Sequence, residues 1–169
     1  MTYFQHNLQT IEDHLHHRPP YLMVDEILSV DAGLIVTGKH LTGEEFFFAG
    51  HFPGAAVLPG AMMQEMCTQS AGALIASQYN PMREYNTHDP HFNEFALGVL
   101  VKVKHARYRG FARPGDQLRI EVKLVEKIGD VFEFAAKVLI AGTNAARKIA
   151  EIQFQLTNIP SKTLSGESA

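Results

Sequence analysis

The sequence predicts an α+β domain in which a long antiparallel β-sheet wraps around one buried helix. Residues 61–78 give the first observation, because good helix formers there make an almost uncharged run that is apolar nearly all round, as in a helix buried on every side. Two strand-like stretches precede this run and four follow it. The turn signals RPGD and IGD separate later strands, and no internal repeat or second domain interrupts the pattern.

Length and composition limit the kind of protein. A chain of 169 residues with 46% hydrophobic and 20% charged residues predicts one globular domain with a sizeable core. We assign residues 1–158 to this domain and expect residues 159–169, which are mostly polar and small, to form a disordered tail. The formal net charge of −3 argues against a general nucleic-acid binder.

Cysteine usage and hydropathy bear on the compartment. Cys67 is the single cysteine, so no intrachain disulfide is possible. The N-terminal residues are polar and lack the apolar core of a signal peptide. No run approaches the roughly 18 apolar residues that a membrane span needs. We therefore expect a cytoplasmic protein without a membrane span.

Local signals predict the elements before the buried helix. Residues 8–16 weakly predict a short helix, and residues 21–31 and 33–42 predict two strands joined by a DAG turn. A loop rich in glycine, proline and aromatic residues follows. Pro59 suits the first position of the next helix, because that position leaves its N–H unpaired in any case and proline has none.

The second half of the chain predicts strands. Pro81 cannot continue the helix, and residues 79–93 are expected to form a loop. Partial alternation of apolar and polar residues then favours strands. We expect these four strands at residues 95–111, 116–129, 131–142 and 146–159.

Glu65 interrupts the apolar helix with a lone carboxylate. A free Glu has a pKa near ~4.3, so keeping it protonated at pH 7 costs about 3.7 kcal/mol. Its neighbours three and four positions away are Ala61, Met62, Thr68 and Gln69. None is a cation, so desolvation would raise the pKa of the carboxyl and make a general acid plausible. The alternative is a structural carboxylate satisfied by the backbone or by Gln69.

His51 and Gly60 could complete a reaction centre with Glu65. Glycines and prolines on both sides of His51 restrict the loop and let a ligand approach its backbone. A neutral imidazole is the natural general base near pH 7, although many loop histidines are merely polar surface residues. Gly60 falls at the predicted helix start, where unpaired N–H groups could hold an oxyanion. A base, an acid and an oxyanion site suit elimination of water next to a carbonyl, but their sequence separation fixes no distance.

Three segments resemble a known family. Residues 50–69 read GHFPGAAVLPGAMMQEMCTQ, which closely resembles the signature of the (3R)-3-hydroxyacyl-acyl carrier protein dehydratases of fatty-acid synthesis. The upstream segment HHRPPYLMVDEIL is similar to the Arg-Tyr-Pro-Phe-Leu-Leu-Val-Asp opening of that family, and ARYRGFARPGDQLRIEV is similar to its Pro-Gly-Asp strand entry. The resemblance covers roughly residues 17–157 and implies the hot-dog fold.

The resemblance also implies roles for individual residues. His51 matches the catalytic histidine and Glu65 the catalytic acid of the family. Gln69 matches the glutamine that orients the acid, and Gly60 matches the glycine at the helix start that faces the thioester carbonyl. The family members that carry Glu at the acid position are usually plain dehydratases, whereas related dehydratase/isomerases usually carry Asp.

Substrate, partners and assembly are implied in the same way. We expect Phe52 and Pro59, from the same signature, to contribute to the substrate site. The implied substrate is a 3-hydroxyacyl chain on an acyl carrier protein, and no cofactor or metal is implied. In the family the histidine and the acid come from different subunits of a dimer, and such dimers often assemble into trimers of dimers.

A basic segment offers a surface for the carrier protein. Residues 102–113 contain no acidic residue, and their cations are Lys102, Lys104, Arg107, Arg109 and Arg113. Positive charge there would attract an acidic carrier protein and raise its association rate. The alternative is a solvated charged face.

Departures from the family pattern leave alternatives open. Ala56 stands where the family usually has proline, and Cys67 and Thr68 lie beside the acid, shortly after it in the chain. These changes could reshape the acyl pocket. A hot-dog thioesterase and a non-catalytic acyl-binding subunit are therefore kept as alternatives to the dehydratase.

Two groups of side chains receive structural interpretations. Cys67 is expected to be an inert core thiol, because it lies on the apolar helix. His14, His16 and His17 are expected on a solvated, capped helix end, because no carboxylate or thiol with ligand spacing accompanies them.

Overall fold

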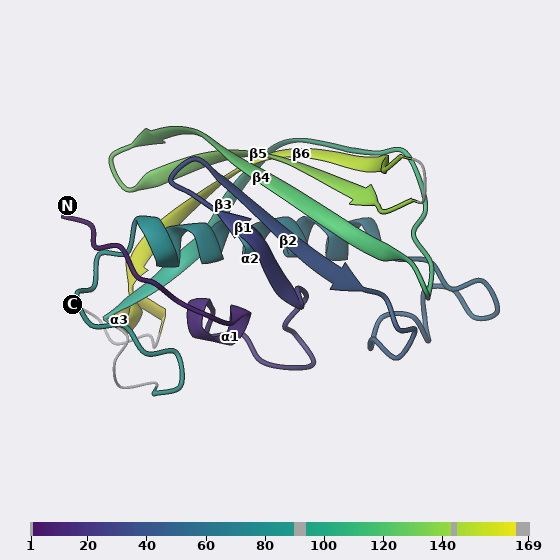
Figure 1. Ribbon diagram of the computed structural model, residues 1–169, viewed down its shortest axis with the longest axis horizontal. Coiled ribbons are helices and arrows are strands. Elements are labelled where there is room, and N and C mark those ends of the chain that lie inside the picture. The colour runs from purple at the N-terminus through teal and green to yellow at the C-terminus, as the bar shows by residue number, and fades with distance from the viewer. Residues whose placement is uncertain (1, 90–93, 143–144, 165–169) are drawn as a thin grey trace.

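Six strands form one antiparallel sheet that packs against one long helix in the computed structural model, which describes residues 2–89, 94–142 and 145–164 (Figure 1). The strand order across the sheet is β1-β2-β4-β5-β6-β3. The strands are β1 (Glu26–Val30), β2 (Leu34–His40), β3 (Phe95–Tyr108), β4 (Gln117–Ile128), β5 (Val131–Ile140) and β6 (Arg147–Pro160). The helices are α1 (Ile11–His14), α2 (Gly60–Gln78) and α3 (Ser161–Leu164). The predicted α+β layout is confirmed.

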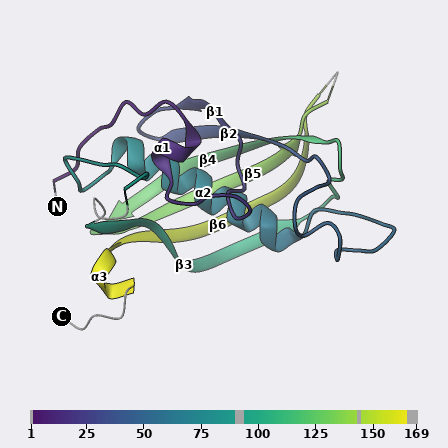
Figure 2. The same cartoon turned by 90° about the horizontal axis from the view of Figure 1, so that it is seen from below.

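Helix α2 is buried on nearly every side, as its composition predicts. One side packs against the sheet, and the N-terminal segment covers another, with Ile11, Leu15 and Met23 buried in the same core. Figure 2 shows α2 lying across the sheet between the margins formed by β1 and β3. Because both faces meet protein, an all-round apolar sequence is the stable choice for this helix.

Alternation along β4, β5 and β6 points one row of side chains from each strand toward α2. The inward residues are Leu118, Ile120, Val122, Phe132, Phe134, Val138, Ile152, Phe154 and Leu156, all buried. The rings of Phe132 and Phe134, both on β5, stack with centroids 6.4 Å apart, and Phe134 stacks on Phe154 of the neighbouring β6 at 5.7 Å. Replacing one such ring by alanine typically costs about 3–5 kcal/mol of stability, so this layer fixes the helix against the sheet.

Strand β3 ends the strand order at the margin of the sheet and approaches α2 closely at its start. Gly98 has φ of 69°, and a Cβ there would lie 2.9 Å from the Cα of Gly72 on α2. Only glycine tolerates both this backbone and this contact. The beginning of β3 is therefore held directly beside the middle of α2.

The structure differs from the sequence expectations at the start of α2 and at the C-terminal tail. Gly60 is the first residue of α2, at the expected helix start, whereas Pro59 is the N-cap and not the first helical residue. The expected disordered tail differs over its described part: Pro160 pairs with Phe95 at the end of β6, and α3 follows. The beginning of the expected tail is ordered because Phe95, at the start of β3, pairs with it. Residues 165–169 lie outside the described residues.

The histidine cluster near α1 is capped as expected, but it is not a solvated helix end. Thr10 and Asp13 form a capping box at the start of α1. His14 is only 2% exposed, and its Nδ1–H donates to the Thr10 carbonyl at 2.6 Å. Packing of this segment over α2 explains the difference, because α1 itself contributes to the core.

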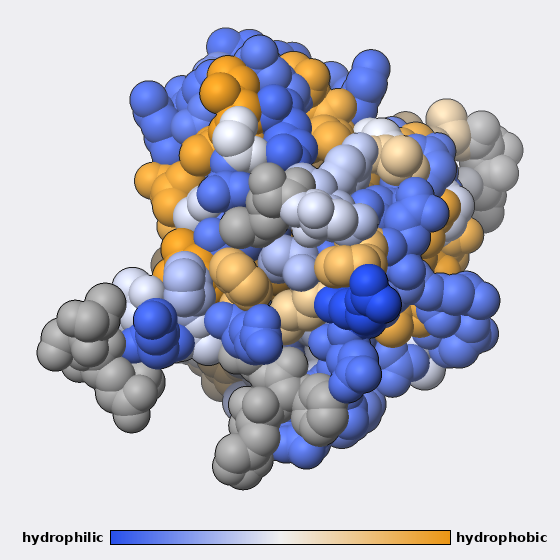
Figure 3. Space-filling model, turned by 90° about the vertical axis from the view of Figure 1, so that its left-hand side faces the viewer, coloured by the Kyte–Doolittle hydropathy of each residue, from blue (hydrophilic) through white to orange (hydrophobic). Residues whose placement is uncertain are grey.

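The face at the end where the two termini lie is mostly polar. Apolar residues form smaller groups between the polar ones (Figure 3). Within the described ranges, none of the helices has the length and apolarity to cross a membrane.

Candidate active site

Glu65 lies in the second turn of α2 and faces a cavity of about 360 Å³. Its side chain is 17% exposed. The N-terminal segment, α2, the start of β3 and Leu164 of α3 enclose the cavity. The lining residues are Leu15, His16, His17, Tyr21, Glu65, Thr68, Gln69, Gly72, Ala96, Leu97, Gly98, Val99, Leu100 and Leu164. Polar groups gather around the carboxyl and apolar groups along β3, an arrangement that suits a ligand with a reactive head and an apolar tail.

Gln69 orients the Glu65 carboxyl. The Gln69 side chain is 1% exposed, and its Oε1 accepts the Met23 backbone N–H at 2.7 Å. That bond identifies the other amide atom as Nε2, a donor. Nε2 donates to the Tyr21 carbonyl and to Glu65 Oε1, both at 2.8 Å. The amide is therefore held by the backbone and presents a fixed N–H to one carboxyl oxygen.

Two further side chains face the carboxyl from the N-terminal segment. Tyr21 lines the same cavity as Glu65. His17 places its Nε2 4.0 Å from Glu65 Oε1, and its ring stacks on that of Tyr21 with centroids 5.8 Å apart. Among the described residues, His17 Nδ1 has no hydrogen-bond partner. The N-terminal segment therefore places Tyr21 and His17 near the Glu65 carboxyl, in addition to the residues of α2.

Burial controls the protonation of these groups. It raises the pKa of the Glu65 carboxyl above its ordinary value, and the hydrogen bond from Gln69 and the nearby Tyr21 hydroxyl act in the opposite direction. Burial also lowers the pKa of His17, and the charges of His16 and Arg18 lower it further. A carboxyl with a raised pKa beside a largely neutral imidazole can hold a proton closer to neutral pH.

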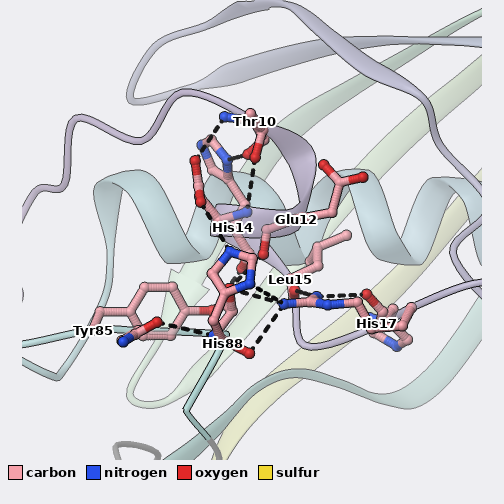
Figure 4. A network of polar contacts seen from close by, with 11 residues as sticks. Thr10, Glu12, His14, Leu15, His17, Tyr85 and His88 are labelled. Carbon is pink, nitrogen blue, oxygen red and sulfur yellow. Dashed lines mark hydrogen bonds and ion pairs between the residues drawn. The ribbon is translucent and has the colours of Figure 1, made fainter.

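The segment that carries His17 and Tyr21 is fixed by a polar network (Figure 4). The Arg18 guanidinium donates to the carbonyls of Leu15 and His17 at 2.7 and 2.8 Å and to the Thr87 carbonyl at 3.1 Å. The Tyr85 hydroxyl donates to the His14 carbonyl at 2.6 Å. The chain after α2 therefore holds the N-terminal segment in place over Glu65.

His51 lies in the loop before α2, with its imidazole held by the loop backbone. Its Nδ1–H donates to the Val57 carbonyl at 2.9 Å, and the Val57 N–H donates back to the His51 carbonyl at 3.0 Å. Because a carbonyl can only accept, the neutral ring carries its proton on Nδ1 and leaves the Nε2 lone pair free to accept one. The Leu58 N–H donates to the Ala112 carbonyl at 2.9 Å and anchors the loop to the body of the protein.

The remaining predicted site residues surround the start of α2. The ring of Phe52 stacks on His51 with centroids 4.3 Å apart, and Phe52 is 56% exposed. Pro59 is the N-cap of α2 and has no side-chain cap. A Cβ at Gly60 would lie 3.3 Å from the Tyr108 ring, so this glycine also allows a tight ring contact. The first N–H groups of α2 have no partner within the helix.

The structure brings some predicted residues together and leaves others apart. The side chains of Glu65 and Gln69 are hydrogen-bonded, and their roles as catalytic acid and orienting residue stay predictions. His51 is not among the described residues that line the Glu65 cavity of the same chain. Cys67 is fully buried, and burial raises the pKa of its thiol, in agreement with an inert core residue. Thr68, on the same helix as the acid, lines the cavity.

The basic residues of β3, and Arg109 directly after it, are exposed but partly paired. Lys104 forms an ion pair with Glu133, and Arg109 Nη2 lies 3.4 Å from Glu151 Oε2. The charges of Lys102 and Arg107 act on the same two carboxylates and help to lower their pKa values. Lys148 also pairs with Glu151, so five cations face the two carboxylates and an excess of positive charge remains on this face.

Tyr21 and His17 are site neighbours that sequence reasoning missed as site residues. Both lie in the segment HHRPPYLMVDEIL, so the similarity of that segment to the family opening is a signal that could have pointed to them. Periodicity could not, because the contact with Glu65 joins segments far apart in the chain.

Comparisons with known proteins agree on one family. A model of the FabA-like domain matches residues 15–150. The chain is 31% identical over 156 residues to the 3-hydroxyacyl-(acyl carrier protein) dehydratase FabZ of Listeria welshimeri, covering 91% of this chain and 98% of that protein. It is 34% identical over 152 residues to the FabZ of Bacillus thuringiensis, covering 89% of this chain and 95% of that protein.

Solved structures agree on the fold. The dehydratase heterocomplex ApeI:P from Xenorhabdus doucetiae matches with a TM-score of 0.73 at 14% identity, covering 95% of this chain and 97% of that one. A hypothetical thioesterase from Streptococcus pneumoniae, solved with coenzyme A, matches with a TM-score of 0.57 at 13% identity, covering 80% of this chain and 85% of that one. At these identities the likeness concerns the fold, and the predicted hot-dog fold is confirmed.

Proposed function

The chain belongs to the FabA-like domain family, and on that premise we propose that it dehydrates (3R)-3-hydroxyacyl thioesters carried by an acyl carrier protein to trans-2-enoyl thioesters. The observation that carries the proposal is the desolvated Glu65 carboxyl, which Gln69 orients inside a cavity with an apolar wall. Homology to FabZ dehydratases at 31–34% identity supports a hydro-lyase.

The reaction assigns one role to each group. His51 Nε2 takes the α-proton, and the N–H groups at the start of α2, near Gly60, hold the negative charge that develops on the thioester oxygen. Glu65 gives its proton to the departing hydroxyl, so a C–H and a C–O bond break, a C=C bond forms and water leaves. Gln69 donates to Oε1, so we assign the transferred proton to Oε2. The proton on His51 then returns to Glu65 through solvent before the next turnover.

A homodimer would complete the site. In one chain His51 is not among the described residues that line the cavity of Glu65, so the base would come from the second copy. Strand β3 supports this arrangement, because it lies at the margin of the sheet and exposes Val101 by 53% and Val103 by 44%. A long strand edge with apolar side chains is normally covered in a native protein. We propose the dimer as the smallest active unit.

The carrier protein would dock on the outward face of β3. The cations Lys102, Lys104, Arg107 and Arg109 leave an excess of positive charge there after pairing with Glu133 and Glu151. An acidic carrier would be attracted in a salt-dependent way.

The function is tested with a short trans-2-enoyl thioester in the hydration direction. Loss of the enoyl absorbance without thiol release, abolished in His51→Ala and reduced by about a hundredfold or more in Glu65→Gln, is the expected result. Loss of a positioned acid or base typically removes about 10²–10⁴ of the rate. Near-normal turnover of Glu65→Gln would overturn the assignment of the acid.

The same assay separates the alternatives. Thiol release by the wild-type protein would identify a thioesterase. Silence toward both the short substrate and a carrier-linked enoyl substrate would identify a non-catalytic acyl-binding subunit. A mixture of His51→Ala and Glu65→Gln chains tests the shared site, because a hybrid dimer retains one intact centre and regains part of the activity.

A further inference from the structure

Gly72 is a glycine in the middle of α2 that lines the cavity of Glu65. Glycine destabilises the interior of a helix relative to alanine, because its backbone loses more conformational freedom on folding. The φ angle of Gly72 is not positive, so the backbone at this position does not require glycine. The reason for a glycine here must therefore lie outside the helix backbone.

Packing against β3 does not supply that reason. The close approach of the two elements requires glycine at position 98, because a Cβ on Gly98 would lie 2.9 Å from the Gly72 Cα. A Cβ on Gly72 would point elsewhere. Among the described residues outside its own helix backbone and its chain neighbours, this Cβ would come within 4 Å of one atom, Leu15 Cδ2 at 3.4 Å. That is close to an ordinary van der Waals distance, so α2 could carry alanine at this position and still pack against β3.

The space beside Gly72 belongs to the cavity and lies two helical turns from the acid. Residues 65 and 72 are seven positions apart, so both face nearly the same side of α2. Gly72 lies about 10.5 Å farther along the helix axis than Glu65, at a rise of ~1.5 Å per residue. Thr68 and Gln69 lie between them on that side, and all four residues line the cavity. The cavity therefore extends along α2 from the carboxyl to Gly72.

The walls on either side of Gly72 suit a hydrocarbon chain. Leu15 of the N-terminal segment lies on one side, residues 96–100 of β3 line the cavity as well, and Leu164 of α3 contributes another apolar group. An extended hydrocarbon chain advances about 1.3 Å per C–C bond, so roughly eight bonds cover the distance from Glu65 to Gly72. A chain that follows this wall would pass Gly72 well beyond its reacting carbon.

We propose that Gly72 determines the length of acyl chain that this protein accepts: the missing side chain leaves room for chains of roughly ten carbons or more to continue past the middle of α2. This inference rests on the proposed function, which makes a 3-hydroxyacyl chain the ligand of the cavity. A methyl group at position 72 would occupy that room, and the end of a longer chain would lose its contacts there. A chain that ends before Gly72 would not meet the methyl group.

Gly72→Ala should therefore change the preference for chain length. Each methylene kept out of an apolar site weakens binding about fourfold. The ratio of kcat/KM for a twelve-carbon substrate to that for a four-carbon substrate is expected to fall about four- to sixteenfold, which corresponds to one or two excluded methylenes. Tm should stay the same or rise by up to about 4 °C, because alanine favours the helix.

Two further variants test whether the methyl group acts by filling this space. Leu15→Val removes Cδ2, the atom that the new methyl group would approach, so the double variant should recover the wild-type ratio to within about threefold. Ser77→Ala is the matched control: it also places alanine at a buried position of α2, but Ser77 is not among the described residues that line the cavity. It should leave the ratio unchanged.

Three results would overturn the proposal. The first is an unchanged ratio in Gly72→Ala, and the second is a ratio that the double variant does not restore. The third is a fall of Tm by more than about 4 °C in Gly72→Ala, because it would show that packing requires this glycine.

Binding of unreactive ligands separates this inference from the proposed function. Alkyl thioethers of N-acetylcysteamine can be neither hydrated nor hydrolysed, so calorimetric titration with a four-carbon and a twelve-carbon member reports on the cavity without any turnover. The wild-type protein should bind the longer ligand more tightly, and Gly72→Ala should lose about four- to sixteenfold of that preference. The same preference in both proteins, or none in the wild type, would refute the role of Gly72 even if the protein is a dehydratase. A reduced preference in the variant would support it even if turnover takes another course.

Discussion

Gln69→Leu should weaken the fold as well as the reaction, because the Gln69 amide satisfies backbone groups on two other residues besides binding Glu65. The substitution keeps nearly the same volume, but it removes the partners of the Met23 N–H and the Tyr21 carbonyl, bonded at 2.7 and 2.8 Å. Leaving the buried Met23 N–H unpaired costs about 1–3 kcal/mol, and the Tyr21 carbonyl, which is only partly buried, adds about 1 kcal/mol, so the two together cost about 2–4 kcal/mol. For a domain of this size about 1 kcal/mol lowers Tm by roughly 2–4 °C, so we expect a fall of at least about 4 °C.

Thermal unfolding at one fixed protein concentration measures this effect, because assembly would otherwise move Tm. Gln64→Leu is the matched control on the same helix. Its amide donates to the Thr68 hydroxyl at 3.1 Å, and that hydroxyl keeps its bond to the backbone carbonyl of residue 64 at 3.0 Å. We therefore expect the control to change stability by less than about 1 kcal/mol. A Tm for Gln69→Leu within about 2 °C of the control would refute the account of this amide.

Two further predictions concern charge. Burial raises the folded-state pKa of Glu65 above its unfolded value, so the folded protein loses stability as the pH rises from the unfolded to the folded pKa and Glu65 ionises. Glu65→Gln should accordingly raise Tm at pH 8 and leave it nearly unchanged at pH 4. Equal shifts of Tm at both pH values would contradict this. Replacing Arg107 and Arg109 together by Ala should lower kcat/KM for a carrier-linked substrate about tenfold or more at low salt. The kcat/KM for a small thioester should change by less than about twofold. Arg119→Ala is the control, because Arg119 is a cation paired with Glu121 on β4. Equal losses on both substrates would exclude docking on this face.

The sequence alone determined the elements and the residue types of the site. Composition marked α2 as buried on all sides, because its residues are apolar nearly all round, and Glu65 stood out as the lone carboxylate among them. Alternation located the strands β4 to β6, because a sheet with one face on a core imposes a period of two. The signature around His51 and Glu65 identified the family. These properties are local or periodic, and each can be read from neighbouring residues.

Only the tertiary structure decided what surrounds the acid. Tyr21 and His17 reach Glu65 because the N-terminal segment folds over α2, and no local pattern encodes that contact. Strand β3 exposes cations that β5 and β6 partly neutralise through Glu133 and Glu151. The pKa of a carboxyl, the orientation of an amide and the net charge of a face all depend on groups brought together across long stretches of chain. They follow from packing, and packing is a property of the whole fold.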